Sequence, residues 1–172
     1  MIEHGLAPER AELIRGVICE KMSKTFLHSA LLSRLGRLME RQLGDRFWVR
    51  REDPLTLVDS EPEPDISVVK GADLDYAPHH PQSAILVVEV AVTSMSDDRE
   101  QAFMYAAAGV AEYWIVNARA GVVEVFTQPV NGAYQQVHSI PGDGVLVSSS
   151  LPELQIDLPA LFAGLPPAVT QD

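Results

Sequence analysis

Two acidic side chains lie where an ionised carboxylate is costly or unusual. Glu89 interrupts residues 85–92, a run that is otherwise apolar at both alternating sets of positions. A strand with this pattern is covered on both of its faces. Because a lone carboxylate in a medium of low dielectric is strongly disfavoured, we expect Glu89 to be protonated, paired with a cation or bound to a metal.

The second acid, Asp65, follows two Glu-Pro pairs and precedes the mostly apolar residues 66–69. Taken alone, an aspartate there is typical of an ordinary strand start. If the strand at 65–69 pairs antiparallel with the strand at 85–90, Asp65 and Glu89 come to the same edge of the sheet. Mg²⁺ prefers one or two carboxylate ligands, with water and substrate phosphate completing its coordination shell. Such an ion, Mg²⁺ or Mn²⁺, can activate water against a phosphodiester.

A helix supplies further candidates. Asp97, Gln101 and Tyr105 recur every four residues and share one helix face that begins shortly after Glu89. The structural alternative is that Asp97 is a first-turn acid favoured by the helix dipole and that Tyr105 packs against the sheet. For Tyr105 we favour this alternative.

The histidines and the cysteine are weaker candidates. His79 and His80 are neighbours in a proline-bounded loop and would point apart, which disfavours chelation. His28 stands at the start of a predicted helix, where a capping or surface role is more typical. The sequence contains no Gly-rich phosphate loop, nucleophile elbow or HExxH motif. A single cysteine, Cys19, can form no internal disulfide.

Length and composition predict one domain over residues 1–172, with 47% hydrophobic and 22% charged residues. Residues 11–19 form two extended pieces around Arg15-Gly16, and residues 27–43 form a helix. Five of its leucines lie close to one side: Leu27, Leu31, Leu35, Leu38 and Leu43. A second side carries three arginines, which we interpret as a solvated face, with a phosphate-contacting face as the alternative. These are Arg34, Arg37 and Arg41.

Short β-branched or aromatic segments bounded by Pro, Asp, Gly or Ser predict the strands. They cover residues 46–50, 55–58, 65–69, 85–90 and 113–117. We expect a helix at 99–108, with N-cap residues in Ser96-Asp97-Asp98 and a C-terminal cap at Gly109. This helix would connect the strands at 85–90 and 113–117 as a right-handed crossover, so we expect those two strands to be parallel. A hairpin closes over Asn131-Gly132, and a short helix lies near 158–164. The fold class is α+β, or mixed α/β, with a mixed central sheet flanked by helices.

The acidic balance restricts the partners. A formal charge of -11 argues against a general nucleic-acid coat. Residues 1–60 carry a net charge of +1 and residues 61–172 a net charge of -12, so a local basic face stays open. No apolar run is long enough to span a membrane, and residues 1–13 lack the order of a signal peptide. We therefore expect a cytoplasmic protein with no membrane partner.

Several segments together resemble a known family. They are residues 11–22 with His28, residues 63–69, 85–90, 96–117, 122–126, 133–137 and 151–162, of which 108–117 is the most specific. The sequence resembles the Uma-two family of restriction-endonuclease-like proteins, within the PD-(D/E)XK nuclease superfamily. The resemblance implies Asp65 and Glu89 as ligands of Mg²⁺ or Mn²⁺, an accessory Glu12 near the same site, and hydrolysis of DNA.

One position departs from that family. The superfamily's usual lysine, two residues after the glutamate, is Ala91 here, and the resemblance places the family's lysine at Gln101. An amide can only hydrogen-bond, and loss of a positioned acid or base costs about a hundred- to ten-thousandfold in rate. Lys70 would point to the opposite face from Asp65, and nothing in the sequence decides whether Lys21 and Lys24 reach the site.

Three hypotheses follow. The first is a metal-dependent endonuclease acting on DNA, impaired at position 101. The second is a catalytically inactive nuclease-fold module that binds a metal or nucleic acid. The third is a structural homodimer or larger homo-oligomer, formed through an exposed apolar strand such as residues 85–90 or 113–116.

Overall fold

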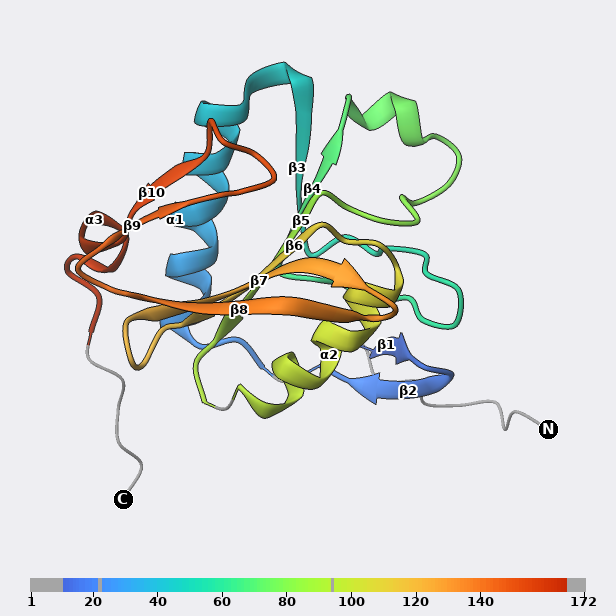
Figure 1. Ribbon diagram of the computed structural model, residues 1–172, viewed down its shortest axis with the longest axis horizontal. Coiled ribbons are helices and arrows are strands. Elements are labelled where there is room, and N and C mark those ends of the chain that lie inside the picture. Colours follow the sequence, from blue (N-terminus) through green and yellow to red (C-terminus); the bar gives the residue numbers. More distant parts are fainter. Residues whose placement is uncertain (1–10, 22, 94, 167–172) are drawn as a thin grey trace.

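The computed structural model describes residues 11–21, 23–93 and 95–166. Its centre is a six-stranded mixed sheet in the order β3-β4-β5-β6-β7-β8 (Figure 1). The strands are β3 Phe47–Arg51, β4 Ile66–Lys70, β5 Leu86–Ala91, β6 Glu112–Asn117, β7 Val122–Val130 and β8 Ala133–Pro141. Only the β5–β6 pair is parallel, and the other neighbouring strands of this sheet are antiparallel. The predicted α+β class, the crossover and the hairpin are confirmed.

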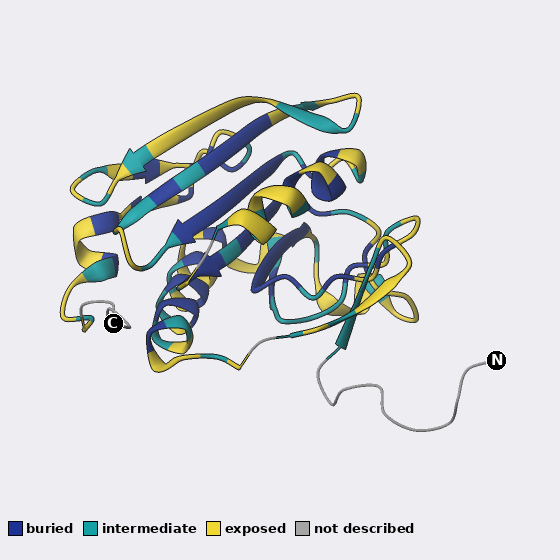
Figure 2. Cartoon of the chain, turned by 90° about the horizontal axis from the view of Figure 1, so that it is seen from below, coloured by how far each residue is buried: buried dark blue, intermediate teal, exposed yellow. Residues whose placement is uncertain are grey.

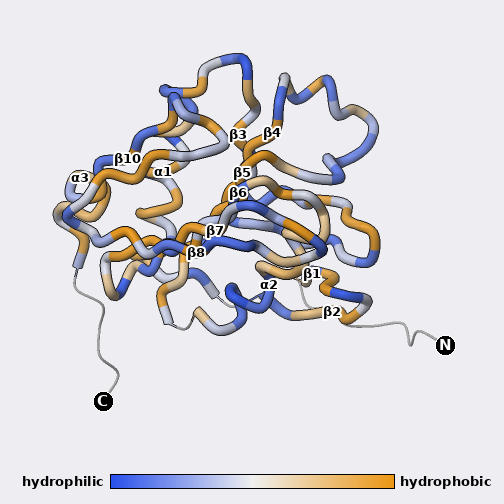
Figure 3. Tube along the Cα trace, viewed as in Figure 1, coloured by the Kyte–Doolittle hydropathy of each residue, from blue (hydrophilic) through white to orange (hydrophobic). Residues whose placement is uncertain are grey.

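Two helices cover the two faces of this sheet. The helix α1, Phe26–Leu43, covers one face of the sheet and shares a core with Val88. The helix α2, Ser96–Ala107, covers the other face and shares a core with Val87. The central strand β5 therefore contributes alternate residues to two separate cores, as its apolar run predicted. Figure 2 shows the buried residues along the central strands and on the sheet-facing sides of the helices. Figure 3 shows that β4, β5 and β6 are mostly hydrophobic.

The helix α1 follows from its sequence with one correction. Thr25 caps its start by accepting a hydrogen bond from the His28 backbone N–H at 3.1 Å, and Gly44 with φ 59° ends it. The predicted core position Leu38 is only partly buried, because the buried stripe turns to include Leu32 and Met39. None of the described helices is long and apolar enough to cross a membrane.

Two local predictions were wrong. Residues 55–58 form no strand. The Leu55 and Thr56 N–H groups donate to the carbonyls of Pro62 and Pro81 within an irregular loop. Proline has no N–H group, so this loop cannot form the regular hydrogen bonds of a strand pair. The helix α2 begins at Ser96 itself and has no side-chain N-cap. Its end is as predicted, because Gly109 adopts φ 75° after the last turn.

The third hypothesis loses its structural basis, because the strands at 85–90 and 113–116 are central. The edges of the sheet are β3 and β8. Dimerisation itself stays a prediction.

The smaller elements attach to this sheet. A hairpin of β1 Ala11–Ile14 and β2 Val17–Glu20 docks on the segment that leads into β4, where the Glu61 N–H donates to the Leu13 carbonyl at 2.7 Å. A second two-stranded sheet packs over α1 with the last helix. The remaining elements are β9 Val145–Val147, β10 Gln155–Asp157, α3 Leu158–Phe162 and the 3-10 turns η1 Gly44–Arg46 and η2 Asp73–Tyr76.

Candidate functional site

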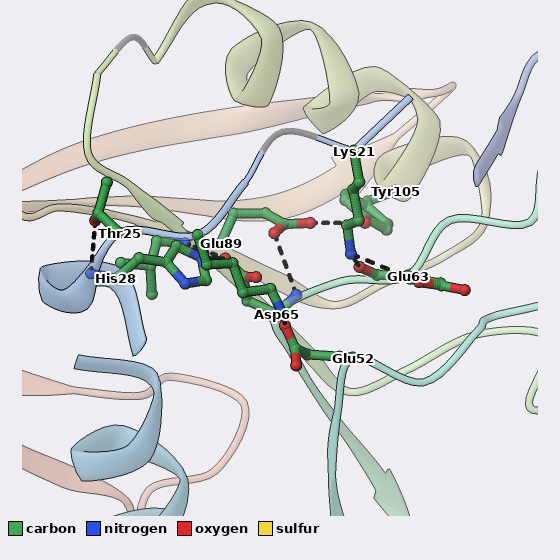
Figure 4. Close-up of polar contacts among 10 residues, drawn as sticks. Lys21, Thr25, His28, Glu52, Glu63, Asp65, Glu89 and Tyr105 are labelled. Carbon is green, nitrogen blue, oxygen red and sulfur yellow. Dashed lines mark hydrogen bonds and ion pairs between the residues drawn. The ribbon is translucent and has the colours of Figure 1, made fainter. Parts of the chain in front are cut away.

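Asp65 and Glu89 meet at one edge of the sheet. Because Ile66 pairs with Val88 in the antiparallel β4–β5 ladder, the preceding Asp65 lies opposite Glu89. The Asp65 N–H donates to Glu89 Oε2 at 3.2 Å, and the Val90 N–H donates to Asp65 Oδ2 at 2.8 Å. Both acids line a cavity of about 330 Å³. The antiparallel pairing that a shared edge requires is present, and it brings the two carboxylates together (Figure 4).

The helix α2 contributes a hydroxyl to Glu89. The Tyr105 hydroxyl donates to Glu89 Oε1 at 3.1 Å, and its fully buried ring lies 5.0 Å from the Tyr113 ring. The Tyr113 hydroxyl in turn donates to the Asp98 carbonyl at 2.9 Å. The predicted packing of Tyr105 is correct but incomplete, because this tyrosine also holds one oxygen of Glu89.

The start of α1 contributes His28 to Asp65. His28 Nε2 lies 2.9 Å from Asp65 Oδ2, and its side chain is only 13% exposed. Its other ring nitrogen, Nδ1, is buried and has no hydrogen-bond partner among the described residues. The interpretation of His28 as a cap or surface residue was therefore wrong for its side chain. The position of the α1 start beside β4 is a tertiary feature that no local pattern announces.

The remaining candidates surround the same cavity. Glu12, Asp97 and Gln101 all line it. Glu12 Oε2 also accepts a hydrogen bond from the Glu63 N–H at 3.1 Å. Asp97 is exposed, whereas its neighbour Asp98, which was predicted only as part of the N-cap, is half-buried in the cavity wall. Because α2 begins at Ser96, residue 98 is part of the helix. Residues 98, 101 and 105 then have the i, i+3, i+7 spacing of one helix side, which faces the sheet.

The lysines differ in position. Lys21 lines the cavity, its Nζ donates to the Glu63 carbonyl, and that Nζ lies 3.9 Å from the Glu63 carboxylate. Lys24 also lines the cavity and pairs with Glu52. Lys70 is exposed at the opposite end of β4 from Asp65.

The two proline-flanked histidines take no part in this cavity. Both side chains are exposed, and His80 Nδ1 lies 3.4 Å from a guanidinium nitrogen of Arg50. That the two histidines make a poor chelating pair stays a prediction.

The cavity is short of positive charge. Burial, followed by the charges of Asp65 and Asp98, holds the pKa of Glu89 well above its ordinary value, although Lys21 and the Asp65 N–H act in the opposite direction. Burial and the neighbouring acids raise the pKa of Asp98 to about 6. Burial would also raise the pKa of Asp65, but hydrogen bonding and charge from His28, the Val90 N–H and Lys21 bring it below its ordinary value.

This donor set suits a hard divalent cation. Within residues 11–21, 23–93 and 95–166, no three His, Cys, Asp or Glu side chains are grouped closely enough to hold a metal by themselves. Two carboxylates beside an open cavity, with room for water, are the arrangement that Mg²⁺ takes more readily than a closed protein cage. A cation between Asp65 and Glu89 would also relieve the repulsion that raises the pKa of Glu89.

Comparisons with known proteins agree with this architecture. The family model Uma2, described as "Putative restriction endonuclease", matches residues 5–159. The fold is similar to the crystal structure of "a putative nuclease belonging to DUF820 from Anabaena variabilis ATCC 29413", with a TM-score of 0.76, 20% sequence identity and 89% of each chain covered. No curated protein matches the sequence.

Proposed function

The chain belongs to the Uma2 family, and we propose that it is a divalent-metal-dependent endonuclease that hydrolyses DNA phosphodiester bonds at the Asp65–Glu89 cavity. One observation carries the proposal: two carboxylates from different strands lie side by side, with too little positive charge around them. The family and the nuclease fold support it, since restriction-endonuclease-like proteins generally use divalent metals.

In this proposal Asp65 and Glu89 hold Mg²⁺ or Mn²⁺. A cation bound there would polarise the phosphodiester and lower the pKa of a bound water. His28 and the Val90 N–H fix one oxygen of Asp65, and the Tyr105 hydroxyl fixes one oxygen of Glu89. These hydrogen bonds orient the carboxylates before a ligand arrives, which is how outer contacts tune a metal site.

Three further residues have accessory roles in the proposal. Glu12 and Asp97 add negative charge at the cavity wall and rim, where each would bind water around the cation. Gln101 takes part in catalysis by hydrogen-bonding the attacking water or the phosphate, and its amide does not supply charge.

Plasmid cleavage with Mg²⁺, Mn²⁺ or EDTA tests the proposal. We expect cleavage that requires a divalent metal and that Glu89→Gln abolishes, because the amide keeps the shape of the side chain but removes its charge. The exposed Glu153, which pairs with Arg46 far from the cavity, provides the matched control Glu153→Gln. Metal-dependent cleavage that persists at the wild-type level in Glu89→Gln would remove this site from the reaction.

A second candidate is an inactive module that keeps the fold and binds a metal or nucleic acid. Gln101 in place of the family's lysine favours it, as does the acidic balance of residues 61–172. The variant Gln101→Lys separates the two candidates. An inert wild type and an active variant would support the module, whereas strong wild-type cleavage eliminates it.

A further inference from the structure

The acidic cavity contains a cation to which the proposed reaction has assigned no role. The chain has three lysines, and Gln101 lines the cavity at the position where the resemblance places the family's lysine. Lys21 follows β2 directly, and its side chain is 19% exposed. Figure 4 shows its ammonium group beside Glu63, in the region where Glu89 and Tyr105 meet.

The β1–β2 hairpin carries Lys21 to this position. The Glu61 N–H donates to the Leu13 carbonyl at 2.7 Å, and Glu12 Oε2 accepts from the Glu63 N–H at 3.1 Å. Both contacts tie the hairpin to the segment that enters β4 at Asp65. Lys21, the residue after the hairpin, therefore lies in the cavity wall, where its ammonium group donates to the Glu63 carbonyl.

The other two lysines fit the role less well. Lys24 is engaged by Glu52, and Lys70 is exposed at the far end of β4. The Lys21 charge acts on both central acids, since it lowers the pKa of Asp65 and opposes the rise in the pKa of Glu89. Lys21 is thus the lysine whose charge reaches both proposed metal ligands.

We propose that Lys21 contacts the scissile phosphate and supplies the positive charge that position 101 lacks. An ammonium group has three donors, so it can keep its bond to the Glu63 carbonyl and still donate to a phosphate oxygen. Its flexible four-carbon stem permits the small shift that a bound phosphate requires. Lys21 acts by offsetting the negative charge that develops on the phosphate. This inference rests on the proposed function.

The central test compares Lys21→Met with Lys70→Met in the full chain. We expect Lys21→Met to lower kcat about a hundred- to a thousandfold, the usual effect of losing one charge-stabilising donor, and Lys70→Met to leave it unchanged. Mn²⁺ affinity measured by calorimetry should become severalfold tighter in Lys21→Met, because a repelling charge has been removed from the cation site. A lysine that only held the loop in place would instead weaken both Mn²⁺ binding and thermal stability.

Two further variants complete the test. Lys21→Arg should keep part of the activity, and the double variant Lys21→Met/Gln101→Lys should regain activity that Lys21→Met has lost. Wild-type kcat in Lys21→Met would overturn the inference, as would a loss of activity accompanied by weaker Mn²⁺ binding and no rescue by Gln101→Lys. If the wild type cleaves no DNA, the proposed function fails by itself. The comparison of Mn²⁺ affinity between the wild type and Lys21→Met then tests whether the Lys21 charge acts on the cation site. An affinity that Lys21→Met leaves unchanged overturns the inference.

Discussion

The backbone N–H of Asp65 donates to the carboxylate of Glu89 at 3.2 Å across the antiparallel strands β4 and β5. The two acids are therefore linked through the backbone as well as by their common cavity. This hydrogen bond keeps the two acids close together but supplies no positive charge, and in the proposed function a cation between them would supply it.

The first prediction concerns Asp98, whose pKa is raised to about 6. Between about pH 4 and pH 6 the folded protein holds a proton that the unfolded chain has already released, so the free energy of unfolding falls as the pH rises through this window. Asp98→Asn removes this dependence and should stabilise the metal-free protein by about 1–2 kcal/mol at pH 7, allowing for screening by solvent.

Urea unfolding between pH 4 and pH 8 measures this effect. Asp143→Asn, at an exposed turn residue, is the control and should leave the pH profile as it is in the wild type. Parallel pH profiles for the wild type and Asp98→Asn would contradict the assignment of a raised pKa to Asp98.

The second prediction concerns the hydroxyl of Tyr105. Tyr105→Phe keeps the ring that packs on Tyr113 but leaves Glu89 Oε1 without this donor. Leaving this buried carboxyl oxygen without a hydrogen-bond donor should lower the free energy of unfolding by about 1–3 kcal/mol and should also slow DNA cleavage. Tyr134→Phe, which removes a hydroxyl bonded to the Val110 carbonyl, should leave cleavage unchanged. Equal cleavage by both variants would exclude a positioning role for Tyr105.

The third prediction concerns stabilisation by metal. A ligand that binds only the folded state raises its stability, by about 2.7 kcal/mol at a free concentration a hundredfold above its Kd. Mn²⁺ should therefore raise the Tm of the wild type and leave that of Glu89→Gln unchanged. The same rise in both proteins would mean that the ion binds elsewhere.

The fourth prediction concerns the arginines of α1, which line a cavity of about 680 Å³ beside α3. Arg34 donates to the carbonyls of Leu161 and Ala163 at 2.8 Å and 2.7 Å and so holds α3 in place. Arg34→Ala should cost about 1.5–3 kcal/mol of stability, and the exposed Arg37→Ala less than about 0.5 kcal/mol, with DNA cleavage unchanged in both. Weaker DNA binding by both variants, without loss of stability, would favour the phosphate-contacting alternative.

The central strands and the meeting of two acids were predictable from sequence because both follow from local patterns. The run around Glu89 is apolar at both alternating sets of positions, so both faces of its strand are covered. The Pro64-Asp65 pair marks where the other strand begins. Antiparallel pairing of these strands then requires the two acids to share an edge. The same patterns failed at residues 55–58, where apolar character suggested a strand but the surrounding prolines prevent one.

The rest of the site depends on how distant elements pack. His28 reaches Asp65 because the start of α1 lies beside β4, and Lys21 reaches Glu63 because the β1–β2 hairpin docks on the preceding loop. Asp98 was missed because its orientation depends on the residue at which α2 begins. The placements of His28 and Lys21 are set by tertiary contacts, and no periodicity in the sequence reports them.

Calorimetric titration of Mn²⁺ into the wild type and into Asp65→Ala tests the central claim most directly. We predict one binding site in the wild type and its loss in Asp65→Ala, with unfolding curves confirming that the variant remains folded. Equal Mn²⁺ affinity in the two proteins, or the absence of any binding to the wild type, would contradict the claim that Asp65 and Glu89 together hold a divalent cation.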